Sequence, residues 1–169
     1  MIGALYDKYV LPKILDVCCS TKPINYQRNK VVPKAKGNVL EIGIGSGLNI
    51  PHYDKSSVNK IIGLDPSEEL NEIAIKNAAN HSVDIDFVIG GAEEIALPSN
   101  SIDTLLITYT LCTIPELKES LKEMKRVIKD DGILLFCEHG IAPDQNIMKW
   151  QNRINPLWSK LFGGCNINR

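Results

Sequence analysis

Short apolar runs recur along the middle of the chain, and polar or amphipathic segments separate them. Five of these runs are short and rich in β-branched or other apolar residues, as buried strands are. They cover residues 39–42, 60–64, 84–89, 102–108 and 133–139. The pattern therefore predicts five strands with buried faces.

The segments between the runs predict helices. Ser67 is placed to cap a helix whose first turn holds Glu68 and Glu69, where carboxylates suit the helix dipole. A second helix opens at Pro115 and ends at residues 130–132, with apolar residues at helical spacing at Leu117, Leu121, Met124, Val127 and Ile128. Strands that alternate with helices predict an α/β fold, a doubly wound, Rossmann-like parallel sheet.

The regions on either side of this core are helical in pattern. Residues 1–36 predict an N-terminal segment of two short helices, divided near Lys22 and Pro23. Ile2, Leu5, Tyr9 and Leu15 lie on one apolar side of the first helix, which packs on the domain or, alternatively, lies on a membrane surface. Residues 37–140 form the core of a single domain 1–169, and residues 141–169 a tail with a helix at 144–162.

Composition narrows the class of protein. The chain has 169 residues, 19 of them lysine or arginine and 20 aspartate or glutamate, so its net charge of −1 gives no argument for nucleic acid. No apolar run is long enough to span a membrane, and the N-terminus does not resemble a signal peptide. Five cysteines without a CxxC pair predict reduced thiols in a cytoplasmic protein, with no metal site and no disulfide framework.

A glycine-rich loop follows the first predicted strand. In "EIGIGSG", Gly43, Gly45 and Gly47 alternate with other residues directly after Glu41 and Ile42. Without Cβ atoms this backbone turns sharply and lets a ligand approach closely, and ligands of such sheets bind beyond the carboxyl ends of the strands. A plain tight turn is the alternative, but three glycines in five residues make it the weaker interpretation.

The spacing of this loop limits the ligand. A dinucleotide fingerprint needs glycine at position 48, which is leucine, and a phosphate-binding loop needs Gly-Lys-Ser/Thr, whereas Gly47 precedes Leu48 and Asn49. Asp65 ends the second strand 22 residues after Gly43, at the offset where an acid accepts ribose hydroxyls. The pattern predicts a nucleoside site without a pyrophosphate, and Leu48 disfavours a nicotinamide oxidoreductase.

Four motifs in order resemble a known family. "EIGIGSG", "GLDPS", "GGAEEIALPSNSIDTLLITYTLCTIPE" and "GILLFCEHG" resemble the class I S-adenosylmethionine-dependent methyltransferases over residues 38–140. "EHGIAPD", "WQNRINPLW" and "FGGCN" are similar to the small bacterial methyltransferases related to thiol and alkyl-thiol methyltransferases. The resemblance implies S-adenosyl-L-methionine as cofactor and a small-molecule methyl acceptor, a thiol or another soft nucleophile.

The resemblance also implies roles for individual residues. The glycines would lie against the methionine part of the cofactor, with Glu41 beneath the loop and facing the amino group. Asp65 would bind the ribose. The remaining cofactor residues would be Pro66, Ala92, Glu93 and Thr108, with Pro66, Ala92 and Glu93 near the adenine and Thr108 at the sulfonium end. For Glu93 and Glu94, a solvated acidic loop is the alternative.

Acceptor residues are predicted near the ends of the last two strands. Tyr109 and Cys112 follow the fourth strand, where this superfamily lines its acceptor pocket, although Cys112 could equally be a small buried hydrophobe. His139 ends the fifth strand as a candidate general base, or as a histidine bonded to backbone.

The tail departs from the family pattern. Complete members add two strands after the fifth, whereas residues 140–169 carry no strand signal, so the chain is expected to be C-terminally truncated. This leaves the fifth strand, with residues "ILLFCE", as an apolar edge that a tail helix or a second copy would cover. The favoured arrangement is a tail helix over the nearby face of the sheet, together with a homodimer that forms through the edge of the fifth strand. The alternative to an enzyme is a module that binds the cofactor without turnover, or that a partner chain completes.

Overall fold

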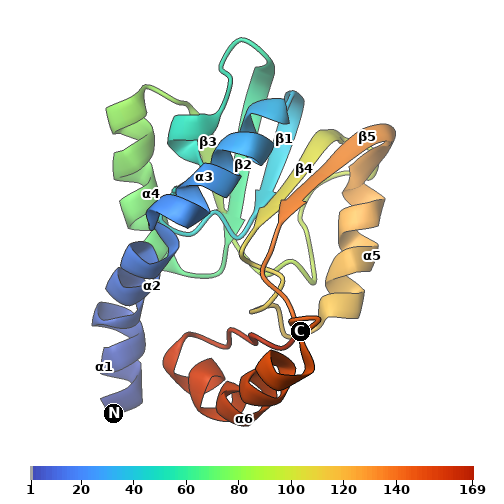
Figure 1. Ribbon diagram of the computed structural model, residues 1–169. Helices are drawn as coiled ribbons and strands as arrows, with labels where there is room; N and C mark the ends of the chain where they lie inside the picture. The colour runs from blue at the N-terminus through green and yellow to red at the C-terminus, as the bar shows by residue number, and fades with distance from the viewer. Residues whose placement is uncertain (1) are drawn as a thin grey trace.

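The five strands form one parallel sheet in the computed structural model, which describes residues 2–169 apart from the side chains of residues 2–4 and 7. The strands are β1 (Gly37–Ile42), β2 (Val58–Asp65), β3 (Ile85–Ile89), β4 (Ile102–Thr108) and β5 (Ile128–Cys137). Their order is β3-β2-β1-β4-β5, and every neighbouring pair is parallel (Figure 1). The predicted fold class is confirmed, and no strand follows β5 among the described residues.

Strand order reverses between β1 and β4. From β1 the chain builds outward through β2 and β3 on one side, and then returns to the other side of β1 as β4 and β5. Glu41 of β1 is paired with Gly63 of β2 and Leu106 of β4. The loop after β1 therefore leaves the sheet at its switch point, where ligands of such folds bind.

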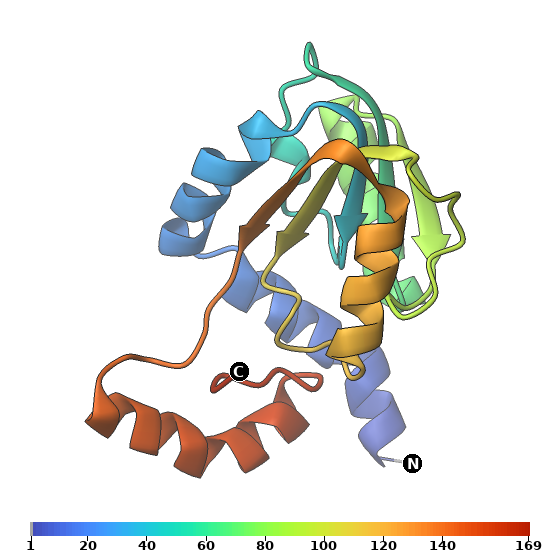
Figure 2. The ribbon, with the colours of Figure 1, turned by 90° about the vertical axis from the view of Figure 1, so that its right-hand side faces the viewer.

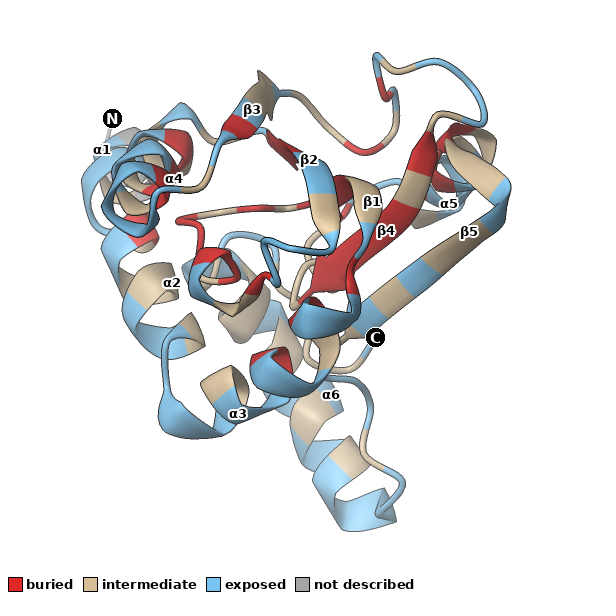
Figure 3. Cartoon of the chain, turned by 90° about the horizontal axis from the view of Figure 1, so that it is seen from above, coloured by how far each residue is buried: buried red, intermediate tan, exposed pale blue. Residues whose placement is uncertain are grey.

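Helices cover both faces of the sheet. On one face lie α4 (Glu68–His81), η1 (Val32–Lys34) and η2 (Ile50–His52), around a core that includes Val39, Ile61 and Leu106. On the other face lies α5 (Leu117–Val127), whose Met124 and Val127 pack with the second core. Seen from above, β4 is buried along most of its length, whereas β5 alternates between partly buried and exposed residues (Figure 3).

The cap predicted for α4 is present. Ser67 Oγ accepts a hydrogen bond from the Leu70 N–H at 3.2 Å, and Glu68 and Glu69 lie in the first turn. This interaction satisfies one of the backbone donors that a helix leaves free at its N-terminus. The helix begins directly after the end of β2, so the cap also fixes where the chain turns beside Asp65.

The N-terminal segment contains three helices, not the predicted two. They are α1 (Ile2–Tyr9), α2 (Leu11–Cys19) and α3 (Lys22–Val31). The break near Lys22 was predicted, but the break at Val10 was missed. It arises because Pro12 lies in the first turn of α2, where the missing N–H costs nothing, so a new helix starts there. Leu5 and Tyr9 are exposed, and the side chain of Ile2 lies outside the described residues.

The bounds of β5 differ from the prediction at both ends. The strand begins at Ile128, which was assigned to the preceding helix, because Ile102 pairs with Ile128 and Thr104 then pairs with Ile133. The residues between form an irregular stretch opposite Asp103, held by an ion pair of 2.6 Å between Lys129 Nζ and Asp103 Oδ1. At the other end β5 stops at Cys137, so Glu138 and His139 lie in the following segment and not on the strand.

The tail helix α6 (Gln145–Leu161) forms as predicted, but it does not cover β5. Asp144 caps it by accepting N–H bonds from Asn146 and Ile147, and Pro156 lies inside it. The helix lies beyond the carboxyl ends of the strands, at the same end of the sheet as α1 and α2 (Figure 2). The prediction that a tail helix covers the fifth strand is therefore wrong, because residues 138–144 carry the chain away from the sheet before α6 begins.

Candidate functional site

A cavity of about 400 Å³ lies at the carboxyl ends of the strands. The loops after β1, β2, β3 and β4 form its floor and sides, and residues of α2 and α3 complete its wall. Its lining includes Leu11, Pro12, Leu15, Leu48 and Leu70, so much of the surface is apolar. Its size and its position at the switch point match those of a small-molecule site.

Two of the three glycines after β1 line this cavity. Gly45 has a φ of +55°, and a Cβ built on it would have only the Gly43 carbonyl oxygen nearby, at 3.9 Å. Its open side therefore faces the space available to a ligand. Gly47 does not line the cavity: at φ +80°, its Cβ would collide with the side chain of Ile50 and approach that of Ala74 to 3.3 Å. Gly47 thus serves the packing of η2 and α4 against the loop.

Asp65 joins the glycine loop to the turn that starts α4. Its Oδ2 accepts a hydrogen bond from the Gly45 N–H and its Oδ1 one from the Ser67 N–H, both at 2.9 Å. Burial raises the pKa of the Asp65 carboxyl, and these N–H bonds oppose the rise. Each carboxylate oxygen keeps a free lone pair, so the side chain can still accept hydroxyls. Pro66, the next residue, also lines the cavity.

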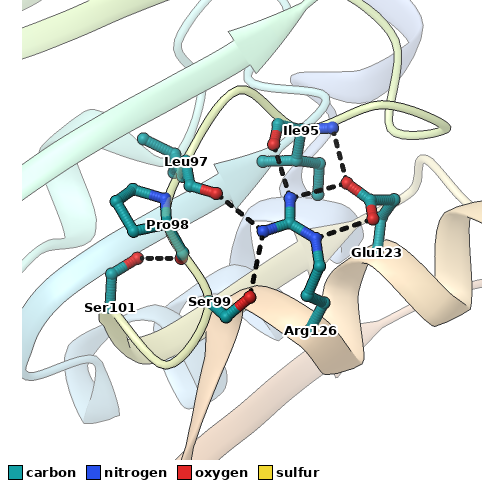
Figure 4. A network of polar contacts seen from close by, with 7 residues as sticks. All are labelled: Ile95, Leu97, Pro98, Ser99, Ser101, Glu123 and Arg126. Carbon is teal, nitrogen blue, oxygen red and sulfur yellow. Dashed lines mark hydrogen bonds and ion pairs between the residues drawn. The ribbon is translucent and has the colours of Figure 1, made fainter.

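The loop that carries Ala92 and Glu93 also lines the cavity, and it is fastened to α5 farther along (Figure 4). Arg126 donates to the carbonyl oxygens of Ile95 at 2.7 Å and Leu97 at 2.8 Å. Glu123 accepts the Ile95 N–H at 3.0 Å and pairs with Arg126 at 2.7 Å, which lowers the pKa of Glu123 to about 2. These contacts fasten the segment after β3 to α5.

Glu41 lies beneath the loop and does not reach the cavity. Its side chain is 1% exposed and accepts hydrogen bonds from Asn49 Nδ2 at 2.9 Å and from the Tyr53 hydroxyl at 2.6 Å. Burial raises its pKa to about 7, against the opposing hydrogen bonds. The expected position beneath the loop is observed, with Asn49 and Tyr53 each bonded to one carboxylate oxygen. The expected role of Glu41 toward a ligand amino group stays a prediction.

Arg28 is a cavity residue that sequence reasoning missed. It comes from α3, is 4% exposed, and its Nη1 donates to Asn49 Oδ1 at 2.7 Å and Thr108 Oγ1 at 2.6 Å. Its Nε is buried without a hydrogen-bond partner. Among the described residues lining the cavity, Arg28 is the only lysine or arginine. No pattern in residues 22–31 marks this arginine, because only the packing of α3 brings it to the sheet.

Thr108 and Tyr109 both line the cavity at the end of β4. Thr108 Oγ1 also accepts a hydrogen bond from Asn49 Nδ2 at 2.9 Å, so it belongs to the same buried network as Glu41. Tyr109 has a φ of +56°, which is strained for a bulky residue, and its ring lies 5.2 Å from the Arg28 guanidinium carbon. Such strain is common at functional positions.

Cys112 and His139 lie outside the cavity lining and beside each other. Cys112 is 3% exposed, His139 is exposed, and Cys165 of the tail joins them. The Cys165 Sγ lies 3.4 Å from His139 Nε2. Interactions with Cys112 and His139 lower the pKa of the Cys165 thiol, against the effect of burial. The structure thus brings together two predicted acceptor-site residues, but behind the cavity wall.

The comparisons with known proteins agree with this geometry. Residues 40–136 match the family model described as "Methyltransferase domain". The chain is similar to the human thiol S-methyltransferase TMT1A, with 30% identity over 81% of this chain and 57% of that protein. It is also 31% identical to the ubiquinone/menaquinone biosynthesis C-methyltransferase UbiE of Campylobacter jejuni, over 81% of this chain and 48% of that one.

A solved structure shares the fold. The crystal structure of YcgJ from Bacillus subtilis superposes with a TM-score of 0.66 and 27% identity, covering 78% of this chain and 56% of that chain. The chain therefore belongs to the methyltransferase domain family, and its fold is that of the class I S-adenosylmethionine-dependent methyltransferases. The chain spans about half the length of the curated relatives it matches. Within residues 2–169, no helix has the length and apolar character required to cross a bilayer.

Proposed function

We propose that this chain binds S-adenosylmethionine in the cavity at the switch point and transfers its methyl group to a small thiol or another soft nucleophile. The observation that supports this best is one cavity that presents the open side of Gly45, the Asp65 carboxylate and the Arg28 guanidinium together. These groups match a ligand with a ribose diol at one end and an amino-acid carboxylate at the other.

The fit to the cofactor rests on complementary chemistry. Asp65 retains acceptor capacity for two hydroxyls, since each oxygen uses one lone pair for a backbone N–H. Arg28 keeps a buried, unpartnered Nε and is the one cation among the described lining residues, which suits a carboxylate. Ala92 and Glu93 offer a backbone N–H and a carboxylate near Asp65 for the edge of a base.

The chain's own contribution to transfer is alignment and exclusion of water. The bound cofactor would supply a methyl group already activated on a sulfonium. Thr108 and Tyr109 lie at the end of β4, where Arg28 and Asn49 hold the threonine hydroxyl through two hydrogen bonds. A fixed pocket of this kind contributes several kcal/mol by holding reactants in line. Leu11, Pro12 and Leu15 of α2 form an apolar wall that keeps the site dry.

A soft nucleophile suits the titratable groups at the cavity. No histidine or lysine is among the described residues that line it, so a general base of ordinary neutral-range pKa is missing there. A thiol has a pKa near 8.5 and loses its proton readily near neutral pH, whereas an alcohol would need such a base. The names of the similar human enzymes are consistent with a thiol acceptor.

A second candidate is a module that binds the cofactor without turnover, or that a second copy completes. Leu134 and Phe136 of β5 are 50% and 60% exposed, and the free edge of β5 offers unpaired backbone groups to another strand. In this case the chain would bind the cofactor but show no transfer as a monomer.

Calorimetry followed by a transfer assay separates these candidates. S-adenosylhomocysteine is expected to bind with a low micromolar Kd, about −8 kcal/mol, whereas NAD should not bind. A panel of small thiols with methyl-labelled donor then tests turnover, with alcohols and amines of matched size as controls. NAD binding in place of S-adenosylhomocysteine would refute the cofactor assignment. Tight binding without labelled product on any acceptor would favour the binding module.

A further inference from the structure

Three side chains that are far apart in sequence meet behind the wall of the cavity. Cys112, His139 and Cys165 each offer one ligand atom, and these three atoms lie within 4.8 Å of one another. Spacing alone gave no hint of this cluster, because the three residues come from the loop after β4, the segment after β5 and the tail. The sequence-based expectation of no metal site rested on the absence of a CxxC pair and on the scattered positions of the cysteines.

The arrangement matches the donor set of a tetrahedral metal site. Two thiolates and an imidazole are preferred ligands of zinc, and Cys₂His sites that leave one position open are known. With metal–sulfur and metal–nitrogen bonds of about 2.3 and 2.1 Å, adjacent ligand atoms lie roughly 3.6 Å apart. The observed distance of 3.4 Å between Cys165 Sγ and His139 Nε2 is close to this edge.

The backbone around the cluster is fixed before any ion binds. The Asn166 N–H and Nδ2 both donate to the Cys112 carbonyl oxygen, at 3.0 and 3.1 Å. Arg169 donates to the carbonyl oxygens of Leu111 and Ile114, at 2.6 and 2.7 Å. The tail is therefore held against the loop that carries Cys112, and the sulfur atoms need little movement to share an ion.

A partly satisfied acidic group, Glu138, lies beside the cluster. Glu138 Oε1 accepts the N–H groups of Thr110 and Leu111, whereas its Oε2 is buried and has no partner. The carboxylate is near enough for its charge to act on Cys112, His139 and Cys165. His139 offsets part of this charge, and a divalent cation at the cluster would offset more of it.

We infer that Cys112, His139 and Cys165 form a binding site for a divalent zinc-type cation, which clips the tail to the ends of β4 and β5. Both cysteines bind such an ion as thiolates, and any thiol proton still present is released to solvent. A water or another donor occupies the fourth position. Gly163 and Thr113 line the cavity and lie close in sequence to Cys165 and Cys112, so the ion stiffens this part of the cavity wall. The inference does not depend on methyl transfer.

The test is metal binding by the full chain, reduced and metal-free, with Co²⁺ as a spectroscopic probe. One Co²⁺ per chain is expected, with visible bands of tetrahedral cobalt and a near-ultraviolet thiolate-to-cobalt charge-transfer band, and Zn²⁺ should displace it. Zn²⁺ affinity is then measured by competition with a chromophoric chelator. Cys165→Ser and Cys112→Ser should each weaken it by about 100-fold or more, and His139→Gln by at least about 10-fold.

Cys18→Ser is the matched control, because Cys18 is an exposed thiol outside the cluster. It should keep the stoichiometry, the charge-transfer band and the affinity of the unaltered chain. His139 is exposed, so His139→Gln tests the site even if the buried Cys112 variant fails to fold. A cobalt spectrum without the thiolate band, or Zn²⁺ affinities of Cys165→Ser and His139→Gln equal to that of the control, would overturn the inference. The inference would also be overturned if Cys112 and Cys165 were recovered as a disulfide and the chain bound no metal after reduction of that disulfide.

Discussion

The buried carboxyl of Glu41 makes the stability of this domain depend on pH. It lies beneath the glycine loop, accepts hydrogen bonds from Asn49 and Tyr53, and is 1% exposed. Burial raises its pKa from an ordinary 4.5 to about 7. Glu41→Gln is the informative substitution, because glutamine has the shape and neutrality of the protonated side chain.

The sign and size of the effect follow from proton binding. Between pH 4.5 and 7, the folded chain holds a proton on Glu41 that the unfolded chain releases, so folding is favoured at the lower pH. The contribution of Glu41 to the free energy of unfolding is fully present below about pH 4.5 and is lost as the pH rises through 7. At about 1.4 kcal/mol for each pKa unit, the loss is about 3 kcal/mol. Glutamine carries no titrating proton and avoids this loss.

Urea unfolding followed by circular dichroism, from pH 4 to 8.5, measures this directly. Taking the difference in free energy of unfolding between the unaltered chain and Glu41→Gln removes the contributions of the other titrating groups, because both chains share them. We expect it to shift by about 3 kcal/mol in favour of the variant across that range. Glu72→Gln, on the exposed side of α4, is the control and should leave the pH dependence unchanged. A constant difference for Glu41→Gln would mean that the pKa of Glu41 is the same in the folded and the unfolded chain, and the reasoning would be wrong.

Further substitutions address the ligand contacts and the sheet edge. Gly45→Val should abolish S-adenosylhomocysteine binding while circular dichroism shows a folded domain, because the valine side chain would enter open cavity space. Persistent binding would place the ligand elsewhere. Asp65→Ala should weaken binding by about 1.5–3 kcal/mol, and the exposed Asp86→Ala should not. Arg28→Met should weaken S-adenosylhomocysteine similarly but spare methylthioadenosine, which lacks the carboxylate; equal losses would refute a carboxylate contact. Light scattering should show a dimer that Leu134→Lys converts to monomer, and an unaltered monomer would exclude edge pairing.

Strand-end positions in the site were predictable because topology determines them. The carboxyl ends of parallel strands meet at one edge, so residues at or just after the ends of β1, β2, β3 and β4 must converge there. Gly45, Asp65, Ala92 and Thr108 accordingly line one cavity. Gly47 has the same local pattern as Gly45 but packs against Ile50, and no feature of the sequence separates the two roles.

The rest of the site depends on contacts between segments that no local pattern encodes. Arg28 reaches Thr108, which lies 80 residues away, only because α3 packs against the sheet next to β5. Cys165 reaches His139 because the tail turns back after α6. The early start of β5 has the same origin, since pairing with Ile102 outweighed the helical spacing that ended at Ile128.

The cavity residues that lie outside the family match bear on which acceptor the protein uses. The family match covers residues 40–136, which supply the glycine loop, Asp65 and the loop after β3. The wall that faces them comes from outside this range: Leu11, Leu15 and Arg28 precede it and Gly163 follows it. Relatives can therefore share the cofactor half of the cavity while differing in the half that contacts an acceptor. Exchanging residues 1–36 with those of a related methyltransferase should change acceptor preference in the thiol panel and leave the affinity for S-adenosylhomocysteine within about tenfold, provided that the Arg28 position is kept.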